Sequence, residues 1–260
     1  MKAGYERLKL IIAYDGRSFR GWQSQTTKDA VQDHLERSLA KLVGERVVVH
    51  GAGRTDAGVH ALGQVAHIDV PRGKFPIRTW ILAINSGLPP EARVLRIQKV
   101  SPRFHARFDA SGKVYAYRIW ASPVLHPLEI GRVWHMPIPL DLELLRAGAD
   151  LICGTHDYSG FVVNRGHEEK DTVRTIRSIR ISRKGPLVTL RFEGTGFLYK
   201  MVRMLTGSLV RCAQGRAPLD WLEKTLKTKG AAKSHFAAPA EGLYLERVLY
   251  LGVAGAGDPD

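Results

Sequence analysis

The chain has 260 residues, of which 44% are hydrophobic and 25% are charged, so it can bury a substantial core and is not expected to be disordered. Lysine and arginine number 39 against 25 acidic residues, which leaves a net charge of +14. This charge predicts an acidic partner, RNA, DNA or an anionic membrane, with an affinity that falls with salt. No apolar run approaches the length that spans a bilayer and residues 1–17 lack the core of a signal peptide, which disfavours the membrane.

Hydrophobic periodicity predicts a first half with the element order βαββαβ. Residues 8–14 alternate apolar side chains on one face, as a half-buried strand does. Apolar residues at three- and four-residue steps predict a helix over residues 29–43. The remaining elements of this half are strands over 46–50 and 63–70, a helix over 77–86 and a strand over 93–100.

The second half repeats that order without an obvious residue-by-residue similarity. Its elements are a strand over 113–121, a helix over 140–153, strands over 173–182 and 187–193, a helix over 199–214 and a strand over 243–251. Both halves therefore look ferredoxin-like. We expect an α+β fold with an N-terminal lobe over residues 1–104, a C-terminal lobe over 105–252 and a flexible tail over 253–260.

The two cysteines, Cys153 and Cys212, stand far apart and outside any Cys-x-x-Cys pattern. Each falls in an apolar helical stretch, where a small buried thiol is the usual explanation. They predict a reducing, cytoplasmic setting.

A glycine-flanked loop, Gly-Ala-Gly-Arg-Thr-Asp-Ala-Gly, occupies residues 51–58. It superficially resembles a dinucleotide-binding loop, but such a loop opens a helix, whereas residues 62–70 alternate as a strand. What remains is a carboxylate, Asp56, on a turn that lets the backbone approach a ligand closely. Arg54 and His60 nearby suit a reactive acid, although such an aspartate more often only makes Asx-type hydrogen bonds within its loop.

Cations and aromatic residues alternate in residues 103–108, Arg-Phe-His-Ala-Arg-Phe, and again in residues 113–118. Cations neutralise phosphates and aromatic rings stack on unpaired bases, so this mixture favours single-stranded or loop RNA. The alternative is a sheet face with an exposed basic edge. Tyr115 and Tyr117 share one side of the predicted strand, so a core role explains at least one of them.

An apolar helical stripe runs through residues 198–209, with Arg203 beside it. An arginine at the margin of such a stripe is usually solvated through its long stem. It gains importance only beside a buried acid, because an arginine partner keeps a secluded carboxylate ionised and oriented. Asp56 is the candidate acid.

These stretches, together with residues 19–25 and 242–245, resemble the TruA family of tRNA pseudouridine synthases over nearly the whole chain. The block Gly-Arg-Thr-Asp-Ala-Gly-Val-His-Ala at residues 53–61 is almost diagnostic. The resemblance implies two ferredoxin-like halves that form an extended mixed or antiparallel sheet, with helices on one face and a central basic cleft. It also implies isomerisation of uridine at positions 38, 39 or 40 in the anticodon stem-loop of tRNA, without metal or organic cofactor, by a cytoplasmic homodimer.

Residue by residue, the resemblance implies that Asp56 is the catalytic carboxylate, that Arg203 pairs with it and that Tyr115 is the active-site tyrosine. Arg54 matches an arginine that helps to extrude the target nucleotide. Further candidates are Leu243 and Leu245 in the base pocket, and Arg20, Trp22, Gln23, His60, Arg103, His105 and Arg107 in contact with RNA.

Two other functions compete with this interpretation. A non-catalytic RNA-binding protein can use the same scaffold, but the presence of Asp56, Tyr115 and Arg203 together argues against it. An RNA methyltransferase would need a glycine loop that opens a helix. The route of isomerisation stays open, since Asp56 can attack C1′ or C6 of the nucleotide or remove the C2′ proton.

Overall fold

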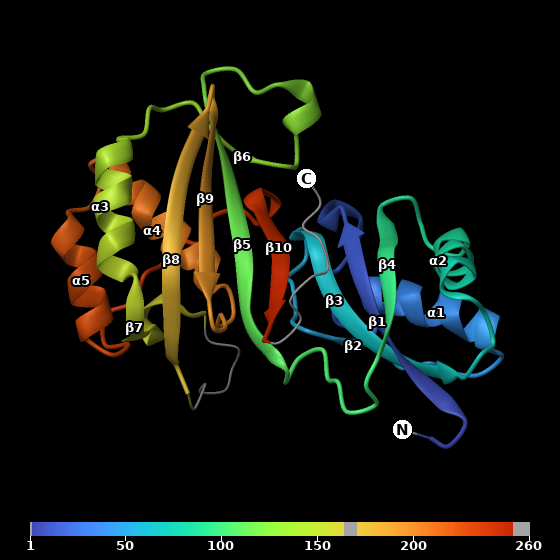
Figure 1. Ribbon diagram of the computed structural model, residues 1–260. Helices are drawn as coiled ribbons and strands as arrows, with labels where there is room; N and C mark the ends of the chain where they lie inside the picture. The colour runs from blue at the N-terminus through green and yellow to red at the C-terminus, as the bar shows by residue number, and fades with distance from the viewer. Residues whose placement is uncertain (1, 164–170, 252–260) are drawn as a thin grey trace. The chain divides into compact units, whose positions relative to one another are not determined.

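Figure 1 shows the chain as a computed structural model, which describes residues 2–163 and 171–251. These residues form five α-helices and ten β-strands, which confirms the α+β class. No helix among them is both long and apolar enough to span a membrane. The tail expected at residues 253–260 lies outside the described residues.

The chain divides into two compact units. The first runs to Gly112 and takes in the described residues from Leu245 onward, and the second is Lys113–Tyr244. This division differs from the expected lobes, because it falls after Gly112 rather than after residue 104 and returns the end of the chain to the first unit. The expected ferredoxin-like lobes over residues 1–104 and 105–252 stay a prediction.

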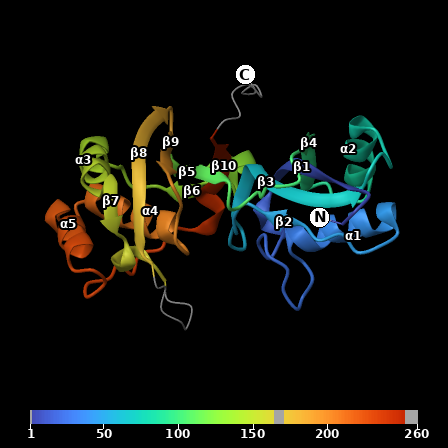
Figure 2. The same cartoon turned by 60° about the horizontal axis from the view of Figure 1, so that its bottom comes forward.

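The first unit contains a sheet with the strand order β4-β1-β3-β10, and β2 pairs with β3. Strand β1 is antiparallel to both β3 and β4. Helix α2 packs on β4, and Figure 2 shows α1 alongside the strands. The elements are β1 (Tyr5–Tyr14), α1 (Val31–Val43), β2 (His50–Gly51), β3 (His60–Pro71), α2 (Ile77–Ser86), β4 (Ala92–Val100) and β10 (Leu243–Tyr250).

Alternation along β1 gives this sheet one apolar and one polar face. Leu8, Leu10 and Ile12 are fully buried, as are the inward residues of α1 and α2, so they form the core under the helices. On the other face, the first part of the strand carries the charged residues Arg7 and Lys9. The register places Arg7 opposite Asp69 and Lys9 opposite His67 on β3.

The second unit has the strand order β5-β9-β8-β7, with β6 parallel to β5. Helix α3 packs on both α4 and α5, and Figure 1 shows the three helices grouped together. Strand β10 begins in this unit at Leu243. The elements are β5 (Ala110–Ala121), β6 (Trp134–Met136), α3 (Leu142–Ile152), β7 (Gly154–Asp157), β8 (Val173–Lys184), β9 (Leu187–Gly194), α4 (Met201–Ala213) and α5 (Leu219–Lys227).

The strand expected at residues 46–50 is the one element that the structure largely replaces, since only His50–Gly51 pairs as a strand. Side chains of α1 bind the backbone there instead: Glu36 accepts the Val49 N–H at 3.1 Å, and Gln32 donates to the Val49 carbonyl at 3.2 Å. Strands β6 and β7 and helix α5 were not expected.

Both cysteines are free thiols, Cys212 buried and Cys153 half-buried. Burial raises the pKa of each thiol. Protonated thiols are poor nucleophiles, which agrees with the expected structural role.

Candidate active site

Asp56 lies half-buried in the loop between β2 and β3. Its carbonyl accepts the Val59 N–H at 3.1 Å, which closes a turn, and Gly58 within that turn takes φ +79°. A left-handed residue is required at this point, and glycine supplies it without steric cost. The aspartate therefore stands on a short, well-defined turn.

The residues just before Asp56 are fixed by the interior of the first unit. The Thr55 hydroxyl lies 2.7 Å from the Tyr14 hydroxyl, and both residues are buried. The Thr55 carbonyl accepts the Trp22 N–H at 3.1 Å, and the Gln64 amide donates to the Gly53 carbonyl at 2.8 Å. A loop held this way presents its carboxylate without a large ordering cost during reaction.

Gly21 brings the segment of residues 19–25 directly against this loop. Its φ is +82°, and a Cβ there would lie 2.6 Å from the Thr55 carbonyl oxygen and 3.0 Å from the Asp56 carbonyl carbon. Only glycine fits such an approach without moving the loop.

Trp22 and His60 were expected to contact RNA, but they are only 2% and 3% exposed. The Trp22 ring lies 6.2 Å from the Tyr14 ring. His60 Nδ1 accepts the Gly16 N–H at 3.1 Å and lies 3.3 Å from the Asp15 carboxylate. Residues this buried offer almost no surface in this structure, and the RNA contacts expected of them stay a prediction.

Four of the expected RNA contacts are exposed cations, namely Arg20, Arg54, Arg103 and Arg107. Arg54 Nε donates to the Gln23 side chain at 3.2 Å, and Gln23 in turn donates to Gln32 at 2.8 Å. Arg54 and Gln23 therefore lie together beside the Asp56 loop.

Burial alone would raise the pKa of Asp15, but hydrogen bonds from Arg17 outweigh it and lower this pKa to about 2.

The turn at residues 103–109 belongs to the same unit. Ala106 packs with Ala52 and Val65 in a small apolar cluster, which we call the Ala106 cluster. Ala52 precedes Asp56 by four residues. The cluster therefore anchors the cationic turn to the chain that leads into the Asp56 loop.

The second unit separates the two tyrosines that the sequence left equivalent. Tyr117 is fully buried and donates to the Pro239 carbonyl at 2.8 Å; burial raises its pKa well above the usual value. Tyr115 is 8% exposed, and its ring meets Phe197 edge-on at 5.2 Å. Tyr117 thus takes the core role, and Tyr115 stays the candidate for the site.

Arg203 lies half-buried on α4. Its Nε donates to the Ala238 carbonyl at 2.7 Å, and the Ala238 N–H donates to the Arg203 carbonyl at 3.0 Å. This reciprocal pair fixes the orientation of the guanidinium. Leu243 is buried in the second unit and Leu245 in the first.

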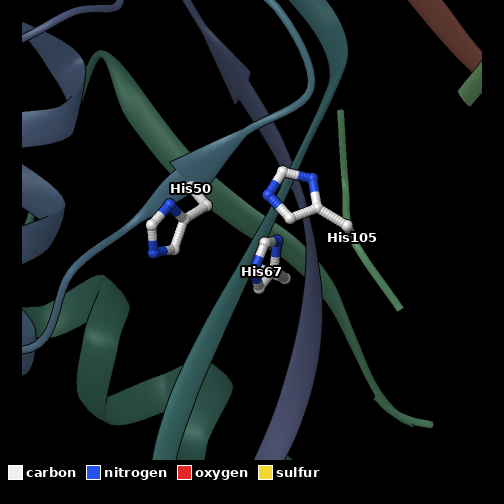
Figure 3. Close-up of side chains that lie close together, drawn as sticks. All are labelled: His50, His67 and His105. Carbon is white, nitrogen blue, oxygen red and sulfur yellow. The ribbon is translucent and has the colours of Figure 1, made fainter. Parts of the chain in front are cut away.

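The sequence did not predict a cluster of three histidines in the first unit, His50, His67 and His105, which Figure 3 shows converging from β2, β3 and the 103–109 turn. Pairing in a β2–β3 hairpin places His50 opposite His67. His105 joins them only through tertiary folding.

One nitrogen of each ring lies within 4.8 Å of the others, a spacing at which the three could hold a metal ion. Two of the rings, however, already use a nitrogen as a hydrogen-bond acceptor. His67 Nδ1 accepts the Ala106 N–H at 3.1 Å, and His105 Nδ1 accepts the N–H groups of Arg107 and Phe108 at 3.1 and 3.2 Å. Since a neutral imidazole has one acceptor nitrogen, Nε2 carries a proton in both rings.

The sequence profile of a family described as tRNA pseudouridine synthase matches residues 10–109 and 149–250. Three similar proteins are each called tRNA pseudouridine synthase A. Those of Akkermansia muciniphila, Methylacidiphilum infernorum and Maridesulfovibrio salexigens are 43%, 41% and 42% identical over 94%, 93% and 97% of this chain and 95%, 94% and 93% of theirs. A chain in a structure titled "Crystal Structure of a Cbf5-Nop10-Gar1 Complex" gives a TM-score of 0.39 at 10% identity over 92% of this chain and 48% of that one, too little to support a conclusion. By the profile and these relatives, the chain belongs to the tRNA pseudouridine synthase family.

Proposed function

We propose that this enzyme isomerises uridine at positions 38, 39 or 40 of the tRNA anticodon stem-loop, with Asp56 as the catalytic carboxylate. The observation that supports the role of Asp56 is its half-buried place on a turn whose neighbours are fixed on both sides. The same resemblance that gives these positions also implies a cytoplasmic homodimer.

The reaction breaks the N1–C1′ bond, turns the uracil and joins C5 to C1′. C5 loses its proton and N1 gains one, so the product is an isomer of the substrate. No electrons are gained or lost overall. Asp56 begins the reaction in its ionised form, as a nucleophile or as a base. A carboxylate held in a fixed geometry is what such a step requires, because the reacting atoms must meet within a narrow range of distance.

Tyr115 and Arg203 act with Asp56 on the same nucleotide in this proposal. The Tyr115 ring offers a flat surface for the uracil and a phenol for late proton transfer. Arg203 supplies a positive charge that keeps the carboxylate ionised. Its orientation by Ala238 supports a positioning role rather than a solvated one.

The tRNA reaches the site through charge. The net charge of +14 supplies attraction to phosphates, and the exposed Arg20, Arg54, Arg103 and Arg107 contribute to it in the first unit. Extruding a base costs a few kcal/mol in a duplex and less near a loop. In this proposal Arg54 helps to hold the target nucleotide out of its stack, and Leu243 and Leu245 line the pocket that receives the base.

Tritium release from tRNA containing 5-tritiated uridine tests Asp56. We expect Asp56→Asn and Asp56→Ala to slow release by about 10⁴-fold or more, while tRNA affinity stays close to that of the wild type. Pseudouridine mapping in tRNAs that carry uridine at only one of the three positions then assigns the target. Normal turnover by either variant refutes the role of Asp56. If the wild-type protein binds tRNA but releases no tritium, the alternative of a non-catalytic RNA-binding protein is favoured.

Arg203→Met tests the charge partner. We expect a severe loss of the single-turnover rate, because Asp56 loses the charge that keeps it ionised. Arg216→Met is the matched control, since Arg216 is an exposed arginine of the same unit. Equal rates for the two variants would mean that Arg203 has no part in the reaction.

A further inference from the structure

We propose that Phe108, supported from below by the three histidines, is a stacking platform for an unpaired base that flanks the target uridine. This inference rests on the proposed function, since it takes RNA as the substrate. It assigns a binding role to Phe108, and it makes His50, His67 and His105 supports for the platform.

The four rings form an unbroken series of contacts, two stacked and one edge-on, which we call the column. Phe108 stacks on His105 with centroids 4.2 Å apart and planes 27° apart. His105 meets His67 edge-on at 4.7 Å, and His67 stacks on His50 at 4.8 Å. Figure 3 shows the three histidine rings packed against one another.

Phe108 caps this column and is 75% exposed. Among the large hydrophobic side chains that are exposed in residues 2–163 and 171–251, it is the one aromatic ring. One of its faces is covered by His105, and the exposed fraction of 75% leaves most of the rest of the ring accessible to a planar ligand. A base that stacks there completes a sandwich whose lower layers already exist.

The turn that carries Phe108 is ordered before any ligand binds. His105 Nδ1 accepts the backbone N–H groups of Arg107 and Phe108, and the Asp109 carboxylate accepts the His105 N–H at 2.9 Å. The Asp109 N–H donates to the His105 carbonyl at 3.1 Å. Binding a base therefore requires little further ordering of the protein.

The charge around the column suits a nucleotide. His67 and His105 are neutral near pH 7, because burial lowers the pKa of His105 and lowers that of His67 to about 3. Positive charge comes instead from Arg107, whose guanidinium lies over the Phe108 ring with its carbon 5.8 Å from the centroid, and the exposed Arg103 belongs to the same turn. An uncharged ring for the base next to a cation for the phosphate is the arrangement that binds single-stranded RNA.

The platform lies close to the proposed catalytic residue within one unit. The Ala106 cluster joins the turn to Ala52, and Asp56 follows Ala52 by four residues. Four residues span at most about 14 Å of extended chain. A base on Phe108 is therefore within a few nucleotides of a uridine at Asp56.

Phe108→Ala tests the platform, with Phe108→Trp as the variant that restores a ring. We expect Phe108→Ala to weaken binding of an anticodon stem-loop RNA about tenfold, with the rate at saturating RNA unchanged, and Phe108→Trp to bind like the wild type. Leu82→Ala is the matched control, because Leu82 is a similarly exposed apolar side chain of the same unit that is not stacked on a ring. Thermal unfolding followed by circular dichroism checks that each variant is folded.

An RNA series with one abasic nucleotide at each loop position identifies the base. In the wild type, one position flanking the target should lose about tenfold in affinity, and Phe108→Ala should show no further loss at that position. The salt dependence should be unchanged in Phe108→Ala, whereas Arg107→Ala should reduce its slope by about 1.

Wild-type affinity in Phe108→Ala, or an equal loss at every abasic position, overturns the platform. Failure of the platform and failure of the proposed function are distinguishable. If the wild type releases tritium while Phe108→Ala binds normally, only the platform fails. If the wild type neither binds the stem-loop nor releases tritium from tRNA, the proposed function fails first.

Discussion

His67 makes the stability of the first unit depend on pH in a way that can be calculated. The ring is 2% exposed, and its Nδ1 is occupied by the Ala106 N–H at 3.1 Å. Burial, followed by the charges of Arg7 and the neighbouring histidines, lowers its pKa from 6.5 to about 3. The unfolded chain therefore binds the proton at a higher pH than the folded chain does.

The sign and size of the effect follow from this difference. Below about pH 6.5 His67 binds a proton in the unfolded state but stays unprotonated in the folded state. Acid therefore lowers the free energy of unfolding by about 1.4 kcal/mol per pH unit. From about pH 7.5 to pH 5.5 the expected loss from His67 is thus about 1.4 kcal/mol. The loss continues as pH falls and ends near pH 3, where the folded state also takes up the proton.

His67→Asn isolates this contribution. The Asn amide oxygen can accept the Ala106 N–H but cannot titrate, so the variant is expected to be less stable overall but about 1.4 kcal/mol less sensitive to pH between about 7.5 and 5.5. Urea unfolding of both proteins at each pH measures the difference, and the shared contributions of the other histidines cancel. Equal pH dependence in the two proteins refutes the reasoning, because it would mean that folded His67 titrates like an exposed imidazole.

Two further predictions concern the loop and the histidine cluster. Gly21→Ala should push on the Thr55 and Asp56 backbone and lower kcat with little change in tRNA affinity. The control is Gly73→Ala, because Gly73 also has a positive φ, +71°, but a Cβ there would have no atom within 4 Å; it should cost about 1 kcal/mol of stability and leave kcat intact. Equal activity of the two variants would show that the contact of Gly21 with the loop is unimportant. Removal of transition metals by phenanthroline, with Mg²⁺ retained for tRNA folding, should leave tritium release unchanged, since the Nδ1 acceptors of His67 and His105 are occupied; loss of activity that added zinc restores would contradict this.

The fold was predictable where the spacing of the hydrophobic residues and the length of the segment indicated the same secondary structure. The helix expected at residues 77–86 has the same bounds in the structure, because its apolar residues recur at helical spacing and a proline precedes it. The strand expected at residues 46–50 failed for a tertiary reason, since Gln32 and Glu36 bind the Val49 backbone from a neighbouring helix. No local pattern reveals which partner a backbone amide will choose.

The site shows the same limit. The Asp56 loop was recognised from its sequence block, but Tyr115 and Tyr117 alternate identically. Tertiary contacts separate them, among them the bond from Tyr117 to the Pro239 carbonyl, which lies 122 residues away in the chain. Trp22 and His60 have side chains suited to RNA, yet both are buried. The residue type predicts what a side chain can bind, but burial, which depends on the tertiary fold, determines whether that side chain is accessible to RNA.

Strand β10 has a consequence for the order in which the protein is made. Its residues from Leu245 lie next to β3 in the first unit, where a Cβ on Gly63 would be 2.5 Å from the Glu246 carbonyl oxygen, and the Tyr250 hydroxyl donates to the Ala106 carbonyl at 2.7 Å. On the ribosome, β3 emerges about 180 residues before this partner strand, so the nascent chain carries an open sheet edge until that strand is made. The first unit therefore reaches its final form only after the whole second unit has been synthesised, and a gene cut between Gly112 and Lys113 would encode two fragments, neither of which contains all the strands of the first sheet.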